Sequence, residues 1–309
     1  MKVINMEKDS SKNSLGKELI FLKFDSDFKE IKIRHVIIMF LITFLILIAI
    51  VIMLNPNEEI SNTNMNILGL IMETLCTIIL IYMIKPSKGK INLLYKDFKS
   101  KLDMKEIILV IIFFTCLNIG AKNIITDIIY AISPSFANGF INDTTWIINS
   151  KTDYWIVFIM LVILTPFTEE IVFRNVFFKR LSKKFNIYFG LIVSSIIFSA
   201  FTNGSGSEAI GFLLLGITNC ILYVKYENIL IPMFIYFINN FLYMLVSIPL
   251  GEVKNKVITL TSTDIIFYAI SGVILFTIGM IFFVEFIIEN KIYLIESFNK
   301  SKSIEIKQG

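Results

Sequence analysis

The sequence predicts an all-α protein, a polytopic bundle of about eight transmembrane helices with both termini on the cytoplasmic side. Its composition is the first indication: 55% of the residues are hydrophobic and only 17% are charged, whereas a soluble domain carries roughly a quarter charged residues. The second is the recurrence of apolar stretches of about 20 residues, the length that crosses a hydrocarbon core of ~30 Å. The third is that Lys and Arg gather in alternate connecting segments.

The apolar stretches define the predicted spans in chain order. They cover residues 36–54, 65–84, 106–132, 154–172, 187–203, 208–224, 229–248 and 265–288. Lys122 and Asp127 interrupt the third stretch, so its outer half is expected to protrude from the bilayer or to lie at its surface. The sequence Asn-Gly-Ser-Gly-Ser at 203–207 predicts a tight turn between the fifth and sixth spans.

The distribution of basic residues sets the orientation of these spans. With the N-terminus inside, the inner connecting segments and tails hold 25 Lys and Arg and the outer segments hold 4. Basic residues accumulate on the cytoplasmic side of membrane proteins, so both termini are predicted to be cytoplasmic. The same bias, together with contact to anionic lipids of the bilayer, accounts for the basic N-terminal segment, and no nucleic-acid partner is expected.

The chain divides into four segments at this stage. Residues 1–35 form a basic cytoplasmic segment without the features of a cleaved signal peptide, so the first span is expected to serve as an uncleaved signal. Residues 36–154 carry three spans and an outer loop, 155–245 carry a membrane core, and 246–309 carry the last span and a cytoplasmic tail. The Lys-, Ile-, Asn- and Phe-rich usage is typical of an AT-rich bacterial genome, which predicts a location in a bacterial cell membrane.

The stretch FTEEIVFRNVFF, residues 167–178, places ionisable groups at the end of the fourth span. Such groups are costly in lipid and indicate a functional site by default. Glu170 and Arg174 are four residues apart and share a helix face, whereas Glu169 points about 100° away. We therefore expect Arg174 to pair with Glu170, and Glu169 to face a cavity in which it can act as a general base for water. A solvated basic helix end is the alternative interpretation.

Three stretches in this region follow one another in a characteristic order. They are TPFTEEIVFRNVFFKRL, SSIIFSAFTNGSG and GFLLLGITNCILYVKYENILIPMFIYFINNF. In order and spacing they resemble the motifs of the CAAX-protease and bacteriocin-processing family of intramembrane endopeptidases, also called the Abi family. Those motifs are Glu-Glu-x-x-x-Arg, Phe-x-x-x-His and His-x-x-x-Asn, and the resemblance covers about residues 155–245.

The resemblance carries over to individual positions, with two departures. The first motif is intact, and Phe198 matches the aromatic residue of the second. Thr202 and Tyr236 stand at the positions of the two family histidines, and Asn239 and Asn240 match the asparagines of the third motif. The resemblance thus implies the following catalytic-site residues: Glu169, Glu170, Arg174, Thr202, Tyr236 and Asn240.

The loss of both histidines bears on the chemistry that the resemblance implies. In the family the glutamate activates water, and the histidines and the asparagine complete the site as water-positioning groups or, in some accounts, as metal ligands. The hydroxyls of Thr202 and Tyr236 can donate hydrogen bonds but do not exchange protons readily near neutral pH. Zinc requires three or four N, S or O ligands, so no metal or other cofactor is expected. The single histidine, His35, lies at the inner end of the first span and is expected to be exposed. Asn203, next to Thr202, is a poor substitute for a family histidine.

Three functions follow as hypotheses. The residues favour a catalytically degenerate member that binds a membrane protein or peptide, for example in bacteriocin immunity or in regulation of the cell envelope. An active glutamate-dependent endopeptidase is the alternative, and a transporter is a remote third because no repeat or broken helix is evident. For Glu73, inside the second span, two orientations stay open: toward the same cavity or toward the membrane surface.

Overall fold

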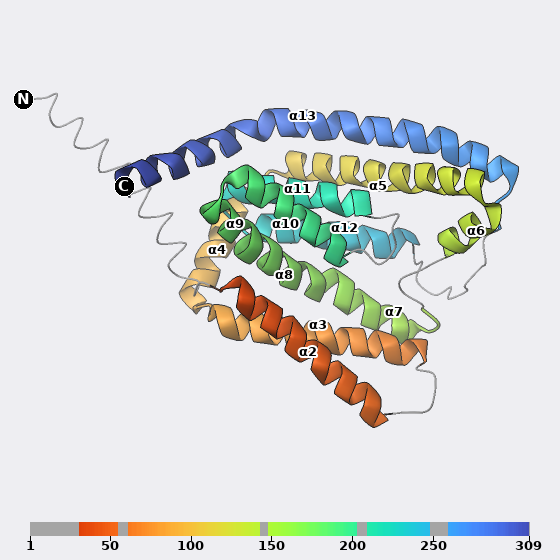
Figure 1. Cartoon of the computed structure of the whole chain (residues 1–309), viewed down its shortest axis with the longest axis horizontal. Coiled ribbons are helices and arrows are strands. Elements are labelled where there is room, and N and C mark those ends of the chain that lie inside the picture. The colour runs from red at the N-terminus through yellow and green to blue at the C-terminus, as the bar shows by residue number, and fades with distance from the viewer. Residues whose placement is uncertain (1–30, 55–60, 143–147, 203–208, 248–258, 309) are drawn as a thin grey trace, which may run out of the picture.

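The computed structural model describes residues 31–54, 61–142, 148–202, 209–247 and 259–308. Over these ranges it is entirely helical, and the helices pack side by side in one bundle (Figure 1). Apolar helices lie at all eight predicted positions: α2 (Ile33–Leu54), α3 (Asn62–Ile84), α5 (Met104–Ile132), the composite helix Lys151–Lys184, α10 (Ile187–Thr202), α11 (Ala209–Tyr226), α12 (Leu230–Ser247) and α13 (Ser262–Gln308).

Within the described ranges, six of these helices are long and apolar enough to cross a membrane, while α10 and α12 are apolar but shorter. The predicted turn at 203–207 lies outside the described residues. The protein is therefore a multi-pass helical membrane protein, as its composition predicts.

The helices alternate in direction along the bundle (Figure 1). One end holds α4 (Lys88–Lys101), α9 (Lys179–Lys184) and the end of α13, while the opposite end holds α6 (Pro134–Asn142) and the start of α7 (Lys151–Phe158). The segments predicted to be cytoplasmic thus meet at the first end. Arg174 is an exception among the cations counted there, because it lies inside a helix and is buried. When Arg174 is left out of the count, the inner segments still hold far more Lys and Arg than the outer segments.

The composite helix Lys151–Lys184 is not a regular α-helix. Two π-helical segments, η1 (Ile159–Leu164) and η2 (Ile171–Phe178), flank the short α8 (Thr165–Glu170). A π-helical turn closes i→i+5 rather than i→i+4 hydrogen bonds, and such turns often occur at functional sites. Both candidate carboxylates therefore lie on a short α-helical insert between two π-helical segments.

The outer half of the third predicted span, which was expected to protrude from the bilayer or to lie at its surface, continues the helix without interruption. Lys122 and Asp127 lie within a continuous helix, α5, which packs along α13 (Figure 1). A Cβ on Gly120 would come within 2.4 Å of the Phe276 backbone nitrogen, so glycine is what permits this approach. Small residues generally allow such close packing in membranes. The exposed Lys122 side chain needs no break in the helix, since a long basic side chain can extend toward the membrane surface.

At the inner end, α4 replaces what was predicted to be a simple connection. Leu94 lies on the buried side of α4, and its carbonyl accepts a hydrogen bond from Asn228 Nδ2 at 3.0 Å. The same amide nitrogen donates to Asp97 Oδ2 at 2.9 Å, and Lys101 Nζ donates to the Tyr226 carbonyl at 2.8 Å. These contacts fix the connection between α11 and α12 and so hold the inner ends of both helices.

A second polar cluster ties α5, α11 and α13 together. The Glu106 carboxylate accepts from Lys225 Nζ at 2.8 Å and from Asn290 Nδ2 at 3.3 Å, and it also accepts from the Tyr226 hydroxyl. Three helices that are distant in sequence thus share one carboxylate near the inner end. These contacts hold α5, α11 and α13 together between the candidate site and the inner end of the bundle.

Candidate functional site in the membrane core

The candidate site lies inside the bundle, away from its inner end. Ten residues separate Glu169 from Lys179, the first residue of the basic α9. An α-helix of that length would rise about 15 Å, and the π-helical η2 rises less per residue, so Glu169 lies within the inner half of a hydrocarbon core of ~30 Å. Ionisable side chains at this depth must find partners inside the bundle, because neither lipid nor bulk water can solvate them there.

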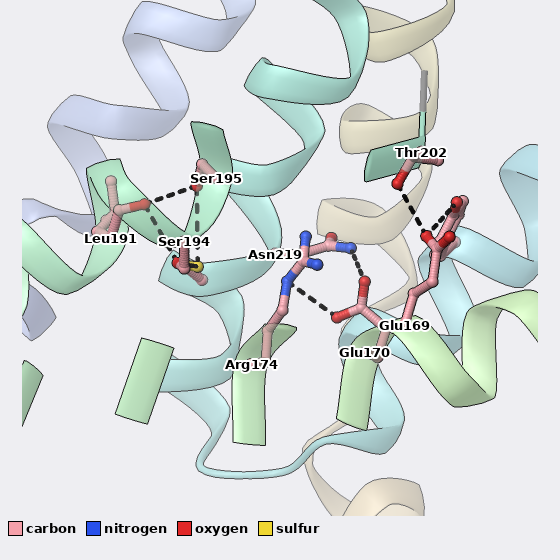
Figure 2. A network of polar contacts seen from close by, with 10 residues as sticks. Glu169, Glu170, Arg174, Leu191, Ser194, Ser195, Thr202 and Asn219 are labelled. Atoms are coloured by element: carbon pink, nitrogen blue, oxygen red, sulfur yellow. Dashed lines mark hydrogen bonds and ion pairs between the residues drawn. The ribbon is translucent and has the colours of Figure 1, made fainter. Parts of the chain in front are cut away.

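Glu170 belongs to a sealed cluster of polar groups. Its Oε2 lies 3.1 Å from Arg174 Nε, as the four-residue spacing predicts, and its Oε1 accepts from Asn219 Nδ2 at 2.9 Å. Figure 2 shows these three side chains converging from α8, η2 and α11. Glu170 is 0% exposed and Arg174 is 1% exposed. The ion pair therefore lies wholly within the protein and is not a solvated helix end.

Phe198 closes this cluster on the side of α10. The guanidinium carbon of Arg174 lies 4.2 Å from the centroid of the Phe198 ring, a cation–π contact. The same ring packs edge-on against Tyr236 at 5.8 Å and against Phe173 at 5.3 Å. The aromatic residue of the second motif thus separates the ion pair from the neighbouring pocket while contacting both.

Glu169 lies in different surroundings, although it is the adjacent residue. Its Oε2 accepts from the Tyr236 hydroxyl at 2.8 Å and from the Thr202 hydroxyl at 3.1 Å. Figure 2 shows the Thr202 hydroxyl above the Glu169 carboxylate. Glu169 is partly exposed, in contrast to Glu170. Two hydroxyls hold one carboxylate oxygen, and the residue as a whole is partly exposed rather than buried.

Glu73 of α3 lies beside this pocket. Its carboxylate is a hydrogen-bond partner of Thr168 and interacts electrostatically with Glu169. The Thr168 hydroxyl also lies 2.8 Å from the Thr77 hydroxyl, which again comes from α3. Of the two orientations that the sequence left open, the structure has Glu73 toward the pocket. A helix outside the three motifs thus contributes a second carboxylate to its wall.

Asn240 contacts the backbone of the composite helix. Its Nδ2 donates to the backbone carbonyl of Leu161 in η1 at 2.7 Å, and its Oδ1 lies 3.5 Å from Asn239 Nδ2. The resemblance implies that Asn240 belongs to the same site as Thr202 and Tyr236. Those two residues donate to Glu169, whereas the Asn240 amide donates to η1.

The sequence did not single out Asn219, which is fully buried and completes the sealed cluster. An asparagine in the middle of an apolar helix was the available signal, since an amide in lipid needs a partner. His35 is exposed at the start of α2, as predicted, and Asn203 lies outside the described residues.

The pocket around Glu169 is a poor fit for a metal ion. Its oxygens come from the Glu169 carboxylate, the nearby Glu73 carboxylate and two neutral hydroxyls, whereas zinc sites combine carboxylates with imidazole or thiolate ligands. Within the described ranges, His, Cys, Asp and Glu side chains nowhere gather in a group of three or more suited to hold a metal.

Comparison with known families identifies the central part of the chain. The family model for type II CAAX prenyl endopeptidase Rce1-like proteins matches residues 151–242. This segment begins with the composite helix, ends in α12 and contains all six candidate residues. No curated protein and no solved structure matches the chain.

Proposed function

Because residues 151–242 belong to the CAAX endopeptidase family, we propose that the protein uses the family's intramembrane site to bind a membrane protein or peptide without cleaving it. The observation that carries this proposal is the pair of hydroxyls on Glu169 Oε2. Both groups donate to the carboxylate, and neither can take up its proton near neutral pH. The two hydroxyls therefore position the Glu169 carboxylate, but they do not exchange protons with it as a hydrolytic mechanism requires.

Amide hydrolysis requires two proton transfers, one from water to a base and one to the departing amine. Glu169 can provide the first, and the second is efficient when a separate group that titrates near neutral pH delivers a proton to the nitrogen. The family resemblance implies histidines in this role, and Thr202 and Tyr236 occupy their positions. General acid–base assistance of this kind is worth roughly 10²–10⁴ in rate, so proteolysis is expected to be weak or absent.

The accessibility of the pocket supports a binding role. Glu169 stays partly exposed, although its neighbour Glu170 is enclosed completely. A polar group in the membrane that served only packing would be better sealed, because exposure to lipid is costly. The pocket can accept hydrogen bonds from the backbone or a side chain of a transmembrane segment. We place the protein in a bacterial cell membrane, where such a partner fits bacteriocin immunity or regulation of the cell envelope.

One observation favours the alternative, an active glutamate-dependent endopeptidase. The phenol of Tyr236 is directed at the pocket and can donate a hydrogen bond to a developing oxyanion, as side-chain donors do in other acyl-transfer sites. Glu169 would then act as both base and acid. This alternative predicts slow cleavage that depends strictly on the Glu169 carboxylate.

Replacing Glu169 by Gln separates the two functions. The amide oxygen of Gln still accepts from both hydroxyls, but the side chain no longer acts as a base. We expect Glu169→Gln to retain the cellular phenotype when it complements a deletion in the source organism. The matched control is Glu289→Gln on the exposed face of α13.

A cleavage assay completes this test. Purified wild-type protein in liposomes is expected to leave transmembrane peptides intact, while the double variant Thr202→His with Tyr236→His restores the implied histidines and serves as the positive control. Cleavage by the wild-type protein that disappears in Glu169→Gln would refute the binding proposal and establish the alternative.

A further inference from the structure

The backbone of η1 contains a carbonyl that the helix itself cannot satisfy. In an α-helix the Leu161 carbonyl would accept from the Thr165 N–H, and in a π-helix from the nitrogen of residue 166. The Thr165 N–H instead donates to the Met160 carbonyl, an i→i−5 bond. Residue 166 is proline, which has no N–H. Both intrahelical donors for Leu161 are thus unavailable.

The side chain of Asn240 supplies the donor. Its Nδ2 lies 2.7 Å from the Leu161 oxygen, and the residue is 8% exposed, so this contact is shielded from water. Asn240 lies one turn after Tyr236 on α12, and Tyr236 donates to Glu169. One face of α12 therefore contacts both the π-helical backbone and the carboxylate that follows it.

We propose that Asn240 is a positioning residue, which keeps η1 in its π-helical form and thereby sets the directions of the two carboxylates. A π-helical turn contains one residue more per hydrogen-bonded ring than an α-helical turn. Converting η1 to an α-helix re-phases the residues after it by about one position, or about 100°. This inference concerns the site of the proposed function, and it applies whether the pocket binds a partner or cleaves one.

The re-phasing falls on α8 because the preceding helix is anchored. Tyr154 and Val157 of α7 are buried in a core cluster with Met244 of α12, which resists rotation of that end. Arg174 follows α8 on the same helix and turns with it, so the re-phasing changes contacts with the neighbouring helices. A turn of about 100° in α8 changes which carboxylate faces Thr202 of α10 and which faces Asn219 of α11. With Asn240 in place, Glu169 faces Thr202 and Glu170 faces Asn219.

The directions of the carboxylates can be read chemically, without a partner or a substrate. A hydrophobic carbodiimide modifies carboxyl groups that it can reach from the lipid phase, and peptide mass spectrometry locates the product. In the purified full-length wild-type protein we expect modification at Glu169 and little at Glu170. In Asn240→Ala we expect the ratio of Glu169 to Glu170 labelling to fall by about tenfold, because the buried Leu161 carbonyl loses its donor.

Pro166→Ala provides the decisive rescue. Alanine restores an N–H at residue 166, within i→i+5 reach of the Leu161 carbonyl, so the double variant Pro166→Ala with Asn240→Ala should recover the wild-type ratio. Asn123→Ala, which removes an amide bonded to Ser271 between α5 and α13, is the matched control and should not change it.

The proposal is overturned if Asn240→Ala labels like the wild type, or if the double variant labels like Asn240→Ala. If Asn240→Ala does not accumulate in the membrane, accumulation of the double variant is the readout: recovery supports the proposal and continued loss refutes it. Loss of partner binding in Glu169 variants has no bearing on these outcomes, so the two proposals can fail separately.

Discussion

Glu169 and Glu170 are neighbours in sequence, yet the two regions around them differ in almost every physical respect. Glu170 has an arginine, an amide and an aromatic lid around it, and it is enclosed. Glu169 has two hydroxyls, a second carboxylate near it and partial exposure. The sealed cluster has the form of a structural element that maintains the bundle, and the surroundings of Glu169 are where we propose that a partner binds.

The two regions together allow the bundle to hold the partly exposed Glu169 carboxylate among its helices. A buried charge is tolerated when a partner and hydrogen bonds compensate it. The Glu170 cluster achieves this on the side of the helix away from the pocket and fixes the rotation of α8. Glu169 then projects into the pocket as a consequence. We therefore expect changes in the sealed cluster to cost stability, and changes in the open pocket to alter function with little loss of stability.

The largest expected effect comes from Arg174→Met. Removal of the guanidinium leaves the enclosed Glu170 carboxylate uncompensated, at a cost of about 3–5 kcal/mol. Thermal unfolding of the purified protein in detergent, together with its abundance in the membrane, measures this loss. The double variant Glu170→Gln with Arg174→Met buries no charge and keeps an acceptor for Asn219, so it should recover most of the stability. Near-normal stability of the single variant would mean that water reaches the pair.

A smaller loss is expected from Asn219→Ala. The Glu170 Oε1 atom then loses its hydrogen bond in a fully buried setting, which costs about 1–3 kcal/mol. Asn92 on α4 is an exposed asparagine, and Asn92→Ala is the matched control, with no measurable change expected. Equal melting temperatures for the two variants would show that Asn219 does not support the ion pair.

The smallest effect on stability is expected from Tyr236→Phe. The ring and its packing against Phe198 remain, and only one of two hydrogen bonds to Glu169 is lost, at about 0.5–1.5 kcal/mol. The proposed partner binding should nevertheless weaken, because Glu169 is then held by Thr202 alone. Tyr82→Phe, at an exposed position of α3, controls for loss of a hydroxyl. A cost as large as that of Arg174→Met would remove the distinction between the two regions.

Much of the fold was predictable, because lipid imposes a simple rule on sequence. Apolar runs of sufficient length must become helices, and all eight predicted positions carry one. Lys122 and Asp127 interrupt the third apolar run but not its helix, because a neighbouring helix and a long side chain can accommodate a charge. The helix α4 was missed because a polar, lysine-rich segment does not show by itself that a partner such as Asn228 will anchor it.

The candidate site was predictable in part, for a related reason. The pairing of Glu170 with Arg174 follows from spacing within one helix, so local sequence was enough. The contacts of Asn219 and Glu73 depend on which faces of α11 and α3 turn inward, and hydropathy does not fix those rotations in uniformly apolar helices. The π-helical segments depend on contacts such as that of Asn240 with Leu161, which join residues far apart in the chain.

The close packing of α5 against α13 has a consequence for biosynthesis. The notch at Gly120 receives Phe276, and Asn123 donates to Ser271, so one side of α5 is complementary to a helix that emerges after all the others described. Until α13 has been inserted, α5 presents a groove and an amide to lipid. A nascent chain interrupted before α13 would leave these features facing lipid. Packing of this side of α5 is therefore completed only when α13 has been inserted.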